Sequence, residues 1–212
     1  MYIPKHFAES RPEVLHRLIR EHPLGMLVTH GGDGLDANHL PFDLDSNVGP
    51  HGLLRGHVAR SNPLWHSVES GANVLVVFRA EEAYISPNWY PSKHEAHKQV
   101  PTWNYSVVHV HGRITIHDDE KHVRGVVARL TRVHEGSRSV PWKMTDAPPD
   151  YIDALLKAIV GIEVEITRLE GKFKLSQNRE TRDRVGAGEA LIASGKVALG
   201  KDMLRMESPD DP

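Results

Sequence analysis

The longest β-strand pattern in this sequence runs from Trp103 to His117, and it limits the fold more than any other segment. Its apolar residues share one parity, so they face the same side of a sheet. These residues are Val108, Val110, Ile114 and Ile116. His109 and His111 then face the opposite side, toward solvent by default, or toward a dimer partner or a ligand. The segment predicts a long strand with one face in the hydrophobic core.

The rest of the chain predicts shorter strands joined mostly by tight turns, with helices inserted between them. Strands are expected at residues 24–29, 35–42, 53–59, 73–78 and 162–175, the first two forming a hairpin. Helices are expected at 10–22, 64–70, 118–134 and 150–160, and from 176 or 178 to about 195. Residues 84–100 resemble a loop, and Gly186-Ala187-Gly188 is expected to mark a helix break or boundary. This order favours a mainly β, antiparallel barrel with peripheral helices over a parallel sheet.

Length and composition predict one domain over residues 1–195, followed by a C-terminal tail at 196–212 that is expected to be flexible. The chain has no cysteine, which excludes disulfides and thiolate metal sites. Its first residues lack an apolar run of signal-peptide length, and no window approaches the roughly 20 apolar residues of a membrane helix. We therefore expect a cytoplasmic protein with no membrane partner.

The familiar catalytic and nucleotide-binding motifs are absent from the sequence: GxxxxGK[ST], GxGxxG, HExxH and GxSxG. His94 and His97 could hold a metal ion, but a solvated polar loop is the favoured interpretation, so no metal site is predicted. No catalytic residue is assigned. The net charge of −2 gives no general attraction to nucleic acid.

The segment from His57 to Asn62 contains a strand end, an arginine and a helix start that Asn62 and Pro63 would cap. Backbone N–H groups, the positive helix end and Arg60 could converge there on a phosphate. An ordinary strand-to-helix turn explains the same residues equally well.

Two further clusters could complete such a site. Lys172 and Lys174 share one strand face and are followed by hydroxyl and amide groups, although lysines also guard exposed sheet edges. Trp103-Asn104-Tyr105 offers flat rings beside an amide, which suits a planar heteroaromatic ligand. Core aromatics that fix the start of a strand are the commoner explanation.

Six motifs in order carry a resemblance to a known family. They are Met1 to Phe7 (MYIPKHF), Asn38 to Phe42 (NHLPF), Gly56 to Arg60 (GHVAR), Tyr84 to Pro87 with Trp89-Tyr90, Val100 to Gly112 (VPTWNYSVVHVHG) and Lys174 to Arg179 (KLSQNR). From Met1 to about Gly195 the chain resembles the PaiB-type proteins, bacterial FMN-binding negative regulators of transcription.

The resemblance implies an antiparallel Greek-key split β-barrel of the pyridoxamine-phosphate-oxidase-like kind, with FMN as cofactor. It also implies a homodimer with flavin sites at the subunit interface. By position, one set of flavin contacts would be Asn38, His39, Leu40, Pro41, His57, Val58, Ala59, Arg60 and Asn62. Residues contributed across the dimer would be Trp103, Asn104, Tyr105, Lys174, Ser176 and Gln177.

Three hypotheses for the function follow. The first is a flavin-dependent redox or sensing protein linked to negative transcriptional regulation, acting on a small molecule. The second is a regulator that binds DNA or a protein partner without flavin chemistry, although neither the charge nor any helix-turn-helix motif supports DNA binding. The third and weakest is a haem-binding or haem-degrading split-barrel protein that uses His94, His97, His109 and His111.

Overall fold

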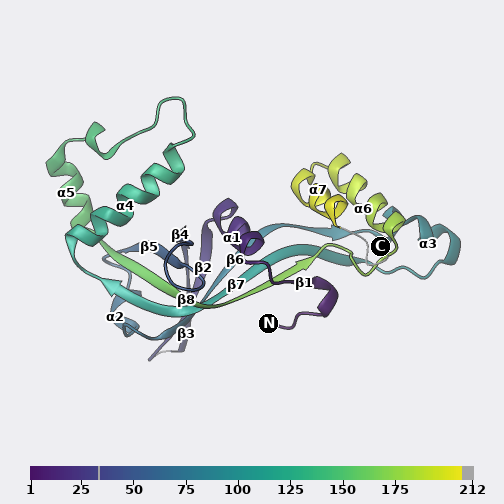
Figure 1. The fold of residues 1–212 in the computed structure, drawn as a ribbon, viewed down its shortest axis with the longest axis horizontal. Helices are drawn as coiled ribbons and strands as arrows, with labels where there is room; N and C mark the ends of the chain where they lie inside the picture. Colours follow the sequence, from purple (N-terminus) through teal and green to yellow (C-terminus); the bar gives the residue numbers. More distant parts are fainter. Residues whose placement is uncertain (33, 207–212) are drawn as a thin grey trace. The chain divides into compact units, whose positions relative to one another are not determined.

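The computed structural model describes residues 1–32 and 34–206, in which eight strands form one sheet (Figure 1). The strand order is β3-β2-β6-β7-β8-β5-β4, and β1 pairs with β8. The strands are β1 (Ala8–Glu9), β2 (Leu24–Gly31), β3 (Gly34–Pro41), β4 (Asp43–Asp45), β5 (Leu53–Ala59), β6 (Asn73–Ile85), β7 (Thr102–His117) and β8 (Ile159–Lys174). The pairs with a recorded register are antiparallel, as predicted.

Helices occupy the segments between the strands and the C-terminal part of the chain. They are α1 (Pro12–Glu21), α2 (Leu64–Ser67), α3 (Pro91–Ala96), α4 (Glu120–Glu135), α5 (Pro149–Lys157), α6 (Thr181–Ala193) and α7 (Val197–Arg205), with short 3-10 turns η1 (Lys5–Phe7), η2 (Pro87–Trp89) and η3 (Met144–Asp146). This combination of an antiparallel sheet and peripheral helices confirms the predicted α+β class. Among the described residues, none of the helices has the length and apolar character needed to cross a membrane.

The chain divides into two compact units. The terminal unit contains Met1–Arg11, Arg79–Val108 and the residues from Glu170 onward, and the central unit contains Pro12–Phe78 and His109–Leu169. The prediction of a single domain over residues 1–195 stays a prediction.

The strands of the central unit alternate buried apolar residues with outward-facing polar residues, and the buried residues form its core. Ile162, Val164 and Ile166 of β8 are buried, whereas Glu163 and Glu165 between them face the other side, as the sequence predicts. In the β5–β8 pair, Leu54 lies opposite Val164 and Arg55 lies opposite Glu163. Because side chains directly opposite each other share a face, β5 and β8 together have one apolar and one charged surface.

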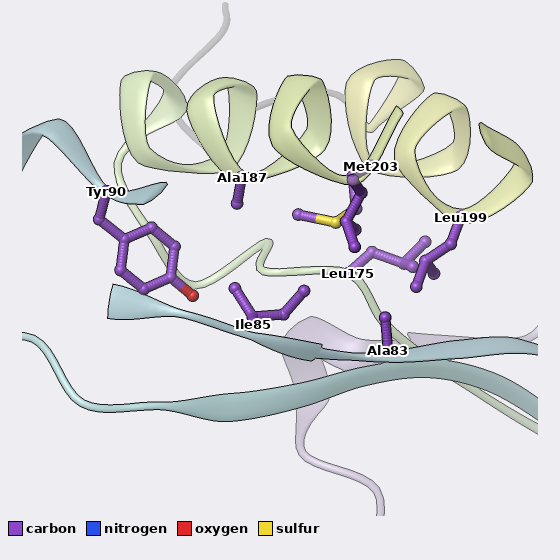
Figure 2. Close-up of a cluster of buried hydrophobic side chains, with 8 residues drawn as sticks. Ala83, Ile85, Tyr90, Leu175, Ala187, Leu199 and Met203 are labelled. Carbon is purple, nitrogen blue, oxygen red and sulfur yellow. The ribbon is translucent and has the colours of Figure 1, made fainter. Parts of the chain in front are cut away.

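The terminal unit has its own hydrophobic cluster (Figure 2). Ala83 and Ile85 of β6 point toward α6 and α7, which contribute Ala187, Leu199 and Met203. Tyr90 and Leu175 are fully buried in the same cluster. The helices therefore cover one face of the β6 segment that belongs to this unit.

Gly186-Ala187-Gly188 lies inside α6, so the predicted helix break at these residues is wrong. The physical reason is close packing. A Cβ on Gly186 would lie 2.6 Å from the backbone oxygen of Trp89, and a Cβ on Gly200 would lie 2.6 Å from the backbone oxygen of Gly188. These glycines let helices approach their neighbours instead of ending a helix.

Three other segments differ from expectation. β6 continues to Ile85, and η2 and α3 occupy most of the predicted loop at 84–100. α2 ends at Ser67, one turn earlier than predicted for the helix at 64–70. In place of a flexible segment from residue 196, α7 forms with Leu199 and Met203 buried; residues 207–212 of the predicted tail lie outside the described residues.

The close approach of α6 and α7 gives a stability prediction. We expect Gly200→Ala to lower the free energy of unfolding by about 1–3 kcal/mol, because the new methyl group would overlap backbone atoms. Gly125→Ala in α4 is the matched control, since a Cβ there meets nothing within 4 Å. It should raise stability by about 0.5–1 kcal/mol through helix propensity. Urea denaturation of both variants measures the difference, and equal effects would contradict this account.

Candidate functional site

The predicted flavin contacts fall into two groups. The residues from Asn38 to Asn62 belong to the central unit, and those from Trp103 to Tyr105 and from Lys174 to Gln177 belong to the terminal unit. Each group has its own local geometry.

In the central unit, the end of β3 and the turn after β5 are joined by a hydrogen bond. Asn62 donates from Nδ2 to Oδ1 of Asn38 over 2.8 Å, and Asn38 in turn donates to Asp36 over 2.8 Å. Asn38 is half-buried, His39 and Pro41 are exposed, and Leu40 is buried. The structure thus brings together two segments that the sequence assigned to one site.

His57 lies on β5, and its buried Nδ1 atom has no hydrogen-bond partner among the residues that the structure describes. Burial lowers the pKa of the imidazole below its usual value, because the charged form loses hydration. A neutral imidazole with an open nitrogen can donate to or accept from a polar ligand atom. Val58 next to it is buried, whereas Ala59 is exposed.

The groups predicted to hold a phosphate at this turn are engaged in other contacts. Arg60 forms an ion pair with Asp118 at 2.5 Å and donates from Nε to the backbone oxygen of Lys157 over 2.6 Å. Asn62 accepts the backbone N–H of Leu64 over 2.9 Å, which occupies one of the free donors of α2. Since α2 has four residues, its dipole is also small.

In the terminal unit, Asn104 is fully buried and is held by a polar network. The side-chain amide of Asn104 lies 2.8 Å from Oγ of Ser176. In the orientation where the amide oxygen accepts a hydrogen bond from this hydroxyl, the amide nitrogen donates to the backbone oxygens of Trp103 and Lys174 over 3.2 and 3.3 Å. Ser176 is buried and has a positive φ of 66°. Gln177 folds back on its own segment, donating to the backbone oxygen of Phe173 over 2.6 Å.

Cations and aromatic rings gather beside this network. The Nζ atom of Lys172 lies 5.5 Å from the ring centre of Tyr105, and Trp103 is 55% exposed with its ring edge-on to Tyr84 at 6.2 Å. Lys174 donates to the backbone oxygen of Trp103 over 2.5 Å. Burial, with the like charges of Lys172 and Arg179, lowers the pKa of Lys174. An anion bound here would relieve that repulsion.

Some contributors to this cluster were missing from the predicted site. Tyr2 places its ring 5.9 Å from Nζ of Lys172, and Tyr90 stacks below the guanidinium of Arg179 at 5.6 Å. Lys172 could have been included, because it alternates with Lys174 on one strand face. His94 and His97 are exposed in and just after α3, where a solvated polar segment was expected.

The chain belongs to the family described as "Putative FMN-binding domain", which matches residues 1–168. This result confirms the family predicted from the motifs, and FMN is the cofactor of that family.

Relatives of similar length support this assignment. An uncharacterized protein of Emericella nidulans is 34% identical over 95% of this chain and 92% of its own length. The protease synthase and sporulation protein PAI 2 of Bacillus subtilis is 32% identical over 90% of this chain and 89% of its own. Similar sequences therefore occur in a fungus as well as in a bacterium.

A solved structure supports the fold. The FAD and heme binding protein from Mycobacterium smegmatis superposes with a TM-score of 0.58 at 16% identity, over 79% of this chain and 73% of that one. The predicted antiparallel split-barrel fold is thereby confirmed.

The buried amide of Asn104 gives a second prediction. We expect Asn104→Leu to lower the free energy of unfolding by about 1–3 kcal/mol, because Ser176 and two carbonyl oxygens lose a buried partner. Asn178→Leu in the same unit, at an exposed position, should change stability by less than about 0.5 kcal/mol. Thermal unfolding followed by circular dichroism compares the two variants; similar losses would argue against the network.

Proposed function

We propose that this chain is an FMN-dependent redox or sensing protein whose activity is linked to negative regulation of transcription. The observation that carries the proposal is the cation and ring cluster of Lys172, Lys174, Trp103 and Tyr105 in a chain of the FMN-binding family. A flavin combines a planar ring with a phosphate, so it needs both kinds of group.

The phosphate of FMN is best accommodated by Lys172, Lys174 and Arg179. The recorded contacts of these three cations are with neutral groups: aromatic rings, a backbone oxygen and the side-chain oxygens of Thr102 and Gln99. Their charge is therefore available to an anion. Arg60, in contrast, would have to exchange Asp118 for the phosphate.

The flavin ring requires flat apolar contacts and polar groups at its edge. Trp103 and Tyr105 of the terminal unit can supply the flat contacts. When bound, the flavin would supply the electron-transfer chemistry. The protein residues bind and orient it.

We further propose that the protein is a homodimer with flavin sites at the subunit interface, as the family resemblance implies. Sedimentation of the purified protein with and without FMN tests this. A monomer at all concentrations in the presence of FMN would contradict it.

Spectroscopy and DNA-binding assays can distinguish a flavin-dependent protein from a regulator that binds DNA directly. A redox or sensing protein should show visible flavin bands that a reductant bleaches and air restores. A direct DNA-binding regulator should instead shift DNA in gels with a steep loss of affinity at rising salt, because phosphate contacts release counterions. Haem bands in place of flavin bands would favour the haem hypothesis.

The position of the phosphate can be tested by comparing FMN with riboflavin, which lacks the phosphate group. We expect Lys174→Gln to weaken FMN binding by about 1.5–3 kcal/mol, because a charged hydrogen bond is lost, and to leave riboflavin binding unchanged. Lys201→Gln, at an exposed position of α7, is the control and should alter neither. Quenching of flavin fluorescence on titration measures both affinities.

The same titration distinguishes the two candidate phosphate sites. If Arg60→Ala reduces FMN binding selectively and Lys174→Gln does not, the phosphate lies at the turn after β5. If the unmodified protein shows no saturable binding of either flavin, the proposed function is wrong.

A further inference from the structure

Two histidines and an aspartate converge where β7 ends and α4 begins. One potential ligand atom from each of His117, Asp119 and His122 lies within 4.8 Å of the other two. His117 is the last residue of β7, Asp119 caps α4, and His122 is in the first turn of that helix. These residues all belong to the central unit.

A second carboxylate faces the same two imidazoles. Glu163 of β8 places Oε2 3.2 Å from Nε2 of His117 and Oε1 3.9 Å from Nε2 of His122. Arg55 donates to Oε1 of Glu163 over 2.9 Å, so an ion pair holds the carboxylate in place. Glu163 can thus serve as a further ligand or orient the histidines.

Gly161 of β8 leaves room for the two imidazoles to lie against each other. Their rings stack with centres 3.7 Å apart and an angle of 9° between the planes. A Cβ on Gly161 would lie 3.0 Å from Cδ2 of His122 and 3.4 Å from Cβ of His117. Gly161 therefore provides the space that the pair occupies.

Within residues 1–32 and 34–206, one buried nitrogen of this pair has no hydrogen-bond partner. Nε2 of His122 is buried and makes no hydrogen bond in the described part of the structure, although Glu163 lies just beyond hydrogen-bond distance. A buried polar atom without a partner is costly, because it has lost water and gained nothing. A ligand at this position would remove that cost.

We propose that His117, His122 and Asp119, with Glu163, bind one divalent transition-metal ion of the zinc type. Two imidazoles with one or two carboxylates form a common ligand set for Zn²⁺, which accepts four ligands in a tetrahedral arrangement. Mg²⁺ and Ca²⁺ prefer oxygen ligands and fit this set poorly. To bind the ion, the stacked rings turn apart so that a lone pair of each points to it.

The ion would connect three elements of the central unit. It would link the end of β7 to the first turn of α4 through the histidines, and to β8 through Glu163. None of its ligands is a predicted flavin contact, so metal binding can be tested separately from the proposed flavin function.

The experiment is isothermal titration of the metal-free protein, prepared with a chelator, with Zn²⁺ alone. We expect one site of high affinity, and substitution of Co²⁺ should give the visible absorption bands of a tetrahedral site. His122→Ala and His117→Ala should each weaken this site at least about 100-fold, and Glu163→Gln by about 10–100-fold. Excess Mg²⁺ should not compete.

Two further variants keep the result interpretable. Asp119→Asn removes a ligand charge but keeps the helix cap that Asp119 forms with the backbone N–H of His122, so affinity should fall while the fold is retained. His134→Ala, at an exposed position near the other end of α4, controls for adventitious binding by other histidines and should leave the site unchanged.

Each outcome decides the proposal. Selective loss in the variants of His117, His122 and Asp119, with the His134 variant unaffected, supports a metal site. Unchanged Zn²⁺ affinity in a folded His117→Ala, His122→Ala double variant, or no saturable binding by the original protein, would show that the cluster is a hydrogen-bonded network only.

Discussion

The ion pair between Arg55 and Glu163 is the interaction on which the central unit depends. The two residues lie directly opposite each other on β5 and β8, and both side chains are 19% exposed. Arg55 also donates to Asp45 of β4 over 2.8 Å, so one guanidinium joins three strands. Because strand side chains alternate, a slip by one residue would bury this pair and expose the apolar face. Removing one partner would leave the other charge poorly hydrated.

The strands were predictable from the sequence wherever one face is buried. The second half of β7 and the first half of β8 alternate clearly, since Val108, Val110 and Ile114 of β7 and Ile162, Val164 and Ile166 of β8 are buried and the residues between them are mostly more exposed. The second half of β6 was missed because Arg79, Glu81 and Glu82 interrupt its apolar run. Pairing with β7, which is not encoded locally, keeps this segment extended. α7 was missed because its apolar positions gain stability from packing on α6, a tertiary contact that periodicity does not report.

The sequence indicated which residues belong to the candidate site, but it did not indicate which partners most of them contact. Asn38 and Asn62 were assigned to one site by motif order, and a hydrogen bond joins them. Arg60 was chosen for its position beside a helix start, yet its partner Asp118 is 58 residues away in the sequence. His117, His122 and Glu163 form no local motif, because the first two lie on either side of a strand end and the third is on another strand.

The arginines of the central unit and the lysines of the terminal unit differ in how far their positive charge is neutralised by neighbouring groups. In the central unit Arg55, Arg60 and Arg129 each contact a carboxylate, which cancels most of their field at short range. In the terminal unit Lys172 and Lys174 contact rings and neutral oxygens, and burial, followed by repulsion from Lys172 and Arg179, lowers the pKa of Lys174. Because a phosphate binds where positive charge is not already neutralised, the chemistry of FMN favours the lysines even though the arginine offers the stronger fork of donors.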